Sequence, residues 1–464
     1  MNPPLRLPAL SFAALLLSFS ALAAPAAPGP LRAGAARVDI TPRVNPGYPP
    51  SGKYGHEHLF IRAIVLDNGV TRAALLGADL GGLSEDIYST AAKQIAALLN
   101  CPVQNIIMSA THTHAGSPAG PPPPGFPRQP TEQIVAAMMD AVRQAKANLQ
   151  PALVGYGAGF SYLNVNRDTV SDQTHRWTQA ANLNAPSDKT VAVVSFTTPS
   201  GDPIAAYVNY AMHPINGYLV GITTADFAGA ACRYVEQAFD DKMVMVFTQG
   251  ASGDQNPLYL RPSTNALASA SGVPATGYEM VRENIEAPLR DRKVPYRRPD
   301  PKVADRFERW IESEGDVLGE EVIRVMSNVH DRSGDVALWG AQTNISCPGR
   351  TRTGSGREGA PGTYTDGPPV GIRLGIVGIG DIALSTVNAE IYTLIGQRAK
   401  KNSPLAHTVV VTLANGRANS GYIPDDASFG HETFQVLGSR LKPGCAEQGI
   451  ANGLDSLISQ YASK

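Results

Sequence analysis

The sequence predicts an α/β fold with a mixed, largely parallel sheet core and flanking helices. A strand, a helix and a second strand follow one another three times along the chain, without an internal repeat of fixed period. Strand, helix and strand in this order form a parallel unit with a right-handed crossover. In each unit, polar side chains follow directly after a strand, and ligands of open α/β sheets bind at that edge.

The first unit begins with the apolar residues 73–76, which predict a buried strand ending at Asp79. Ser84 is a typical N-cap for the next helix. The apolar side chains of this helix recur at helical spacing; they are Ile87, Ala91, Ile95 and Leu98. Residues 105–110 then form the second strand.

The second strand leads into Thr111-His112-Thr113-His114. Because alternate residues of a strand point the same way, we expect both imidazoles to leave one face of the backbone. Neutral imidazole is the commonest zinc ligand in proteins, so the pair indicates one ligand and a neighbouring base or orienting group. A motif this short also arises by chance, so other residues must support it.

The other two units place single polar side chains in the same way. Strand 204–210 leads to His213, and strand 382–387 leads to Glu390. Tyr422 lies in the loop after the last strand. His213 taken alone is more typical of a packed histidine bonded to the backbone than of a metal ligand. We expect these groups and His112 along one rim. The remaining predicted elements are a helix at about 226–239, a helix that follows Glu390 and ends at about residue 400, and strands at 243–248 and 408–413.

The N-terminal residues predict export. Arg6 precedes a largely apolar stretch that ends in small residues, which is typical of a secretory signal peptide spanning 1–23, followed by a Pro/Ala linker over 24–33. The stretch is too short to span a bilayer, and no later segment reaches ~20 uninterrupted apolar residues. We therefore expect an exported protein, periplasmic or secreted, with no transmembrane segment.

Residues 34–464 are expected to form a single domain, although their length also allows two. The polar, charged segment 258–340 indicates an insertion or cap with a helix at 302–326, and Pro118 to Pro130 predict a stiff loop. The net charge of −1 and the lack of a basic run argue against a nucleic-acid partner. A Cys347–Cys445 bridge is one of the pairings that the four cysteines allow, and sequence alone does not choose among them.

Several motifs in register resemble those of the neutral/alkaline, non-lysosomal ceramidases. Residues 111–116 (THTHAG) resemble the family's Thr-His-Thr-His-Ser-Gly, and residues 210–214 (YAMHP) resemble Phe-Ala-Val-His-Pro. Residues 253–257 (GDQNP) fall where the family has Gly-Asp-Val-Ser-Pro, and residues 388–390 (NAE) correspond to Pro-Gly-Glu. Asn166-Arg167 and residues 413–422 also match. Order and rough spacing agree from about residue 36 to about residue 438.

This resemblance implies a ceramidase-like catalytic domain that holds one zinc ion per chain through His112, His213, Glu390 and Tyr422. It implies a role for His114 beside the water, and a place for Asp254 and Asn256 in the catalytic centre. Arg167 and Phe434 fall on the substrate side. The implied reaction is hydrolysis of the amide bond of a small or lipid-like N-acyl substrate by zinc-bound hydroxide.

Two departures from the family pattern concern the substrate. Asn256 replaces the family's serine; it cannot form a covalent intermediate, but its amide can hold an oxyanion. Phe434 replaces a tyrosine and has no hydroxyl to donate. We therefore expect that ceramide is not the best substrate. An esterase or lactonase and a non-catalytic, zinc-containing binding protein are the alternatives. The chain ends soon after Tyr422, so no C-terminal immunoglobulin-like domain is expected, and the oligomeric state is not indicated.

Overall fold

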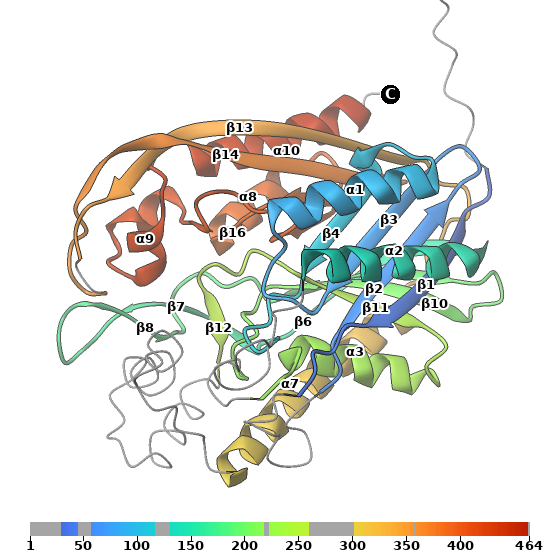
Figure 1. Cartoon of the computed structure of the whole chain (residues 1–464), viewed down its shortest axis with the longest axis horizontal. Coiled ribbons are helices and arrows are strands. Elements are labelled where there is room, and N and C mark those ends of the chain that lie inside the picture. Colours follow the sequence, from blue (N-terminus) through green and yellow to red (C-terminus); the bar gives the residue numbers. More distant parts are fainter. Residues whose placement is uncertain are drawn as a thin grey trace, which may run out of the picture.

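Two layers of β-sheet pack face to face, and helices cover their outer faces (Figure 1). The computed structural model describes residues 29–44, 57–116, 130–217, 222–258, 301–355 and 358–462. The predicted signal peptide, the first half of the linker (24–28) and nearly all of the Pro-rich loop lie outside these residues. Strands of both layers share one core that includes Leu75, Phe196, Tyr207, Ile379 and Val411. Burial on both faces explains why these strands are apolar almost throughout.

One layer is a five-stranded sheet in the order β4-β3-β2-β1-β5. Helices α1 and α2 cover its outer face (Figure 1). The Ser84 hydroxyl caps α1 by accepting a hydrogen bond from the Ile87 amide (3.2 Å), as predicted. The elements are β1 (Arg32–Asp39), β2 (Phe60–Asp67), β3 (Arg72–Ala78), α1 (Glu85–Leu99), β4 (Ile106–Ala110), α2 (Thr131–Ala147) and β5 (Gln150–Pro151).

The opposite layer contains two four-stranded sheets. The first has the order β11-β10-β9-β6 and is covered by α3 and α7. The helix predicted at 302–326 is confirmed as α7, whereas residues 259–300 of that predicted insertion lie outside the described residues. The elements are β6 (Leu153–Phe160), β9 (Thr190–Thr197), β10 (Pro203–Tyr210), α3 (Asp226–Ala238), β11 (Val244–Gln249) and α7 (Pro301–Ser327).

The second sheet of this layer has the order β13-β14-β15-β17 and packs against α8 and α10. A disulfide joins Cys347 on β13 to Cys445, next to α10, and closes a loop of 98 residues. Closing a loop this long restricts the unfolded chain. Cys101 and Cys232 are free. The elements are β13 (Leu338–Arg352), β14 (Tyr364–Ile379), β15 (Ile382–Val387), α8 (Thr393–Asn402), β17 (His407–Val411) and α10 (Ala446–Ala462).

Two small sheets complete the described fold. One has the order β12-β7-β8, and the other is the parallel pair of β16 and β18. A short helix, α9, follows β18. Their bounds are β7 (Asn164–Val170), β8 (Trp177–Asn182), β12 (Gln255–Pro257), β16 (Glu390–Ile391), β18 (Tyr422–Ile423) and α9 (Phe434–Gly438).

The expectation of a largely parallel core is wrong. The three predicted units are present, with β3·β4, β10·β11 and β15·β17 pairing in parallel. Each unit, however, extends an antiparallel arrangement: β1-β2-β3, β6-β9-β10 or β13-β14-β15. The physical reason is that short turns connect several of these neighbours, and a short turn can join only antiparallel strands. Within the described residues, no helix is long and apolar enough to cross a bilayer.

Candidate metal centre

His112 lies just past the end of β4, in a turn rather than in the strand. Its amide donates to the Leu80 carbonyl (3.0 Å), and its φ of 68° is left-handed. The strand alternation that we expected for His112 and His114 is therefore wrong. The turn nevertheless brings the two rings together, with centroids 4.7 Å apart. A left-handed backbone at a non-glycine residue costs about 1–3 kcal/mol and is typical of functional sites.

His213 follows β10 and is completely buried. Its amide donates to the Gln255 carbonyl (3.2 Å), and its Nδ1 donates to the carbonyls of Ser252 (2.8 Å) and Gln255 (3.1 Å). His213 therefore has the backbone bonds of a packed histidine, and these bonds also fix its ring. The ring lies 4.8 Å from that of His112, between centroids.

Glu390 and Tyr422 are register partners in the parallel pair of β16 and β18. Glu390 Oε2 lies 3.1 Å from His112 Nε2 and 3.2 Å from His213 Nε2. Tyr422 Oη lies 3.4 Å from His213 Nε2. The structure thus brings together the four side chains that the sequence placed on one rim, and the short pairing of β16 with β18 sets two of them side by side.

The donor set fits a zinc ion. His112 Nδ1 donates to the Gly81 carbonyl (2.6 Å) and His213 Nδ1 also donates to carbonyls, so each neutral imidazole directs its Nε2 lone pair toward Glu390. Lone pairs and a carboxylate facing one another are stabilised by a metal ion between them or by a proton on His112 Nε2; burial opposes that proton, but Glu390 raises the pKa of His112 above its usual value. Zinc–ligand bonds of about 2.0–2.1 Å place the ligands of a tetrahedral site about 3.3–3.4 Å apart. The separations of 3.1, 3.2 and 3.4 Å are close to that value.

His114 belongs to the same cluster. Its Nε2 lies 3.3 Å from His112 Nε2, and the three histidines form a group that could hold a metal ion. Burial and the neighbouring His112 lower the pKa of His114 well below its usual value. Burial and Arg167 lower the pKa of His213 to about 4. Burial opposes the ionisation of Glu390, but His112 and His213 hold the pKa of its carboxyl well below the usual range. Unprotonated histidines and an ionised carboxylate are the forms that bind a metal.

Arg167, on β7, lies buried beside this cluster. Its guanidinium carbon is 5.4 Å from the centre of the Tyr422 ring and 5.3 Å from that of Phe434. Arg167 Nη1 donates a hydrogen bond to Asn256 Oδ1 (3.1 Å). This bond fixes the side-chain amide of Asn256 so that its NH2 group can act as a donor. The Phe434 and Tyr422 rings meet edge to face, with centroids 5.5 Å apart. Arg167, Asn256 and Phe434 therefore form one wall beside the donor set.

Asp254 does not join the histidine cluster. Its Oδ2 accepts from Asn166 Nδ2 (2.8 Å), and its Oδ1 accepts from the Thr393 amide (2.9 Å). Burial raises the pKa of this carboxyl to about 7. Asp254 thus connects β7 to the start of α8, behind the wall formed by Arg167, Asn256 and Phe434. Its contacts are those of a residue that positions these elements.

Sequence reasoning missed a second buried carboxylate, Asp168. It accepts hydrogen bonds from Tyr392 Oη, His431 Nδ1 and Gln435 Nε2, each at 3.0 Å. These bonds hold the chain on both sides of Phe434. The only sequence signal was its position next to Arg167.

Comparison with known proteins identifies the family and the fold. The family model "Neutral/alkaline non-lysosomal ceramidase, N-terminal" matches residues 33–271, just over half of the chain. A ceramidase complexed with C2 shares the fold with a TM-score of 0.66 and 16% identity, over 92% of this chain and 74% of that chain. A neutral ceramidase from Pseudomonas aeruginosa gives 0.65 and 16%, over 93% and 75%. The protein therefore belongs to the neutral/alkaline non-lysosomal ceramidase family.

Proposed function

We propose that the protein is an exported hydrolase that uses one zinc ion, held by His112, His213, Glu390 and Tyr422, to cleave the amide bond of an N-acyl substrate. The convergence of these four donors carries the proposal. Membership of the ceramidase family supports an amide substrate. The signal-peptide pattern of the first 23 residues supports export to the periplasm or the medium.

A zinc ion held by these four residues would supply a Lewis acid able to polarise a carbonyl and to lower the pKa of water. His114, unprotonated because its pKa is lowered, accepts a proton from the attacking water and returns it to the leaving amine. The Asn256 amide, oriented by Arg167, donates to the carbonyl oxygen as negative charge develops on it.

The wall of the site supports a substrate other than long-chain ceramide as the preferred one. Phe434 presents a half-exposed ring where a tyrosine would offer a hydroxyl, and Asn256 offers an amide in place of a hydroxyl. A substrate hydroxyl left without its partner costs a large factor in specificity. A smaller acyl compound with fewer hydroxyl groups therefore suits this wall better.

We expect a panel of substrates to show the highest kcat/KM for a short N-acyl amide, and at least about 10-fold less for long-chain ceramide in detergent. The panel pairs each amide with an ester of the same acyl length and includes simple lactones. If esters or lactones alone are hydrolysed, an esterase or lactonase is the correct assignment. If zinc-replete protein hydrolyses none of these compounds, it is a binding protein. If ceramide is the best substrate, the inference that Phe434 and Asn256 disfavour ceramide is wrong.

Ser252→Ala should retain most of the activity. Ser252 is buried, and it is its backbone carbonyl that accepts from His213 Nδ1, so removal of the hydroxyl leaves that bond in place. The proposed reaction has no acyl-enzyme, and mass spectrometry after a single turnover should detect no acylated peptide. An acyl group trapped on Ser252 would overturn the mechanism.

A further inference from the structure

Asp168 is a buried carboxylate on which side chains from two distant segments converge. Its side chain is 3% exposed. Tyr392 Oη and His431 Nδ1 each donate to Oδ2 at 3.0 Å, and Gln435 Nε2 donates to Oδ1 at the same distance. A further donor, the Thr433 hydroxyl, lies 3.4 Å from Oδ2. Since these donors all belong to the protein, Asp168 acts through them rather than on a substrate.

Three of the donors flank Phe434, because they belong to residues 431, 433 and 435. Thr433 and Gln435 are completely buried, whereas Phe434 between them is 36% exposed. The Phe434 ring meets the Tyr422 ring edge to face, with centroids 5.5 Å apart. The segment therefore faces two ways: the side chains on either side of Phe434 donate to Asp168, and Phe434 itself faces the metal centre.

The rest of the candidate site is held by other bonds. Arg167 donates from Nη1 to Asn256 Oδ1 (3.1 Å), and the parallel pairing of β16 with β18 holds Glu390. Removal of Asp168 would leave these interactions in place. Its loss would therefore act mainly on the segment that carries Phe434.

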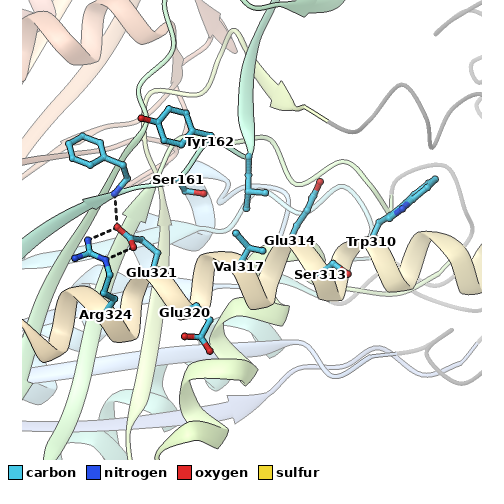
Figure 2. A pocket seen from close by; sticks show the side chains of 11 residues that line it. Ser161, Tyr162, Trp310, Ser313, Glu314, Val317, Glu320, Glu321 and Arg324 are labelled. Carbon is cyan, nitrogen blue, oxygen red and sulfur yellow. Dashed lines mark hydrogen bonds and ion pairs between the residues drawn. The ribbon is translucent and has the colours of Figure 1, made fainter.

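A cavity of about 790 Å³ between α7 and the segment that connects β6 to β7 offers another apolar surface (Figure 2). Its lining includes Tyr162, Trp310 and Val317 but no residue of the metal centre and none of the wall that contains Phe434. Phe434, in contrast, contacts Tyr422. A substrate held at the metal centre would therefore meet the Phe434 ring rather than this cavity.

We propose that Asp168 is a positioning residue for substrate binding: its hydrogen bonds to the segment 431–435 fix the Phe434 ring against the substrate. The proposal rests on the proposed function, because it requires a substrate at the metal centre. A contact made equally with the bound substrate and with the transition state changes KM and leaves kcat unchanged. Asp168 should therefore act on KM, in contrast to His114, which should act on kcat.

The test is a double-mutant cycle on the zinc-loaded, full-length protein, with the compound that the wild type hydrolyses best. Phe434→Ala should raise KM about 10-fold through the lost ring contact. Asp168→Ala should raise KM at least about 5-fold and leave kcat within about 3-fold of the wild type. Because Asp168 acts through Phe434, the double variant should have the KM of Phe434→Ala alone. Additive rises in KM, or an effect of Asp168→Ala on kcat alone, would contradict the proposal.

Two milder variants keep the test decisive if Asp168→Ala folds poorly, since that change leaves buried donors without an acceptor. Asp168→Asn keeps an oxygen for Tyr392 and His431, and its NH2 can donate to Gln435 Oε1, which has no partner in the described structure. Its KM should lie between those of the wild type and the alanine variant. His431→Ala removes one donor whose side chain is 24% exposed, and it should raise KM about 3-fold with kcat unchanged. A wild-type KM in His431→Ala would overturn the proposal.

Asp188→Asn is the matched control. It changes another largely buried carboxylate, whose partners are Lys400 on α8 and Thr190 on β9 and not residues of the wall. It may lower the thermal unfolding midpoint, but it should change neither KM nor kcat. A rise in KM as large as that of the Asp168 variants would show that any weakened carboxylate has this effect, and the proposal would be wrong.

The fluorescence of Trp177 gives a readout that does not depend on activity. The Trp177 ring stacks on the ring of His431, with centroids 3.8 Å apart. Its emission, obtained by difference from Trp177→Phe, should change in Asp168→Ala because His431 loses its acceptor. Unchanged emission in the folded variant would contradict the proposal. If the emission changes but no compound is hydrolysed even by the wild type, Asp168 does hold this segment and the proposed function is what has failed.

Discussion

His213→Ala should abolish both metal binding and hydrolysis. His213 is completely buried, its ring is fixed by two carbonyls, and its Nε2 faces both Glu390 and Tyr422. Loss of a hydrogen bond behind a metal ligand already costs about 10–100-fold in affinity, so loss of the ligand itself should exceed about 100-fold. Elemental analysis of protein purified without added metal should find about one zinc per chain in the wild type and almost none in the variant.

The matched control is His58→Ala, which removes an exposed imidazole paired with Asp39. It should keep full zinc and full activity. A cavity at a buried histidine also lowers stability, and unfolding alone would abolish zinc binding and activity. Circular dichroism is therefore used to check that both variants fold. Full zinc occupancy in a folded His213→Ala protein would remove His213 from the ligand set and contradict the proposed centre.

His114→Gln should reduce kcat on the order of 10²-fold while zinc remains bound, which is the usual contribution of a general acid–base group. His114 Nε2 lies 3.3 Å from His112 Nε2, which suits either a proton acceptor beside the metal or a ligand of it. The two roles differ in what the variant loses: the rate alone, or the rate and the metal together.

Zinc content and the pH profile of kcat therefore decide between these roles. A proton acceptor predicts full zinc and a changed acidic limb of the profile, because the group that titrates there has been removed. If the folded variant loses its zinc, His114 is a ligand; if it turns over like the wild type, His114 is a packing residue. Either result contradicts the role that we propose.

The strand–helix–strand units could be predicted because their signals are local. An apolar run, a capping serine and helical spacing located β3, α1 and β4 to within a residue or two. The antiparallel neighbours were missed because their pairing depends on contacts between segments far apart in the chain, as when β6 pairs with β9. Periodicity identifies a strand but does not identify its partners.

In the candidate site, too, the residues with local sequence signals could be predicted, and the features that depend on long-range contacts could not. Motifs identified His112, His213, Glu390 and Tyr422, and the fold brings them together. The left-handed turn at His112 had no signal, since nothing in Thr-His-Thr-His marks a positive φ. Asp168 and the histidine that donates to it are 263 residues apart, so only the folded chain shows that the two meet.

The pairing of β16 with β18 has a consequence for how the protein would acquire the proposed metal. Only His112 and His114 are neighbours in the chain; His213, Glu390 and Tyr422 come from distant segments, and the pairing of β16 with β18 sets Glu390 beside Tyr422. An unfolded chain therefore offers at most a weak, two-histidine site, and the tight zinc binding that we propose would require the folded chain. A chain that crosses a membrane unfolded would take its zinc from the compartment it enters, and the free energy of that binding would oppose its unfolding there.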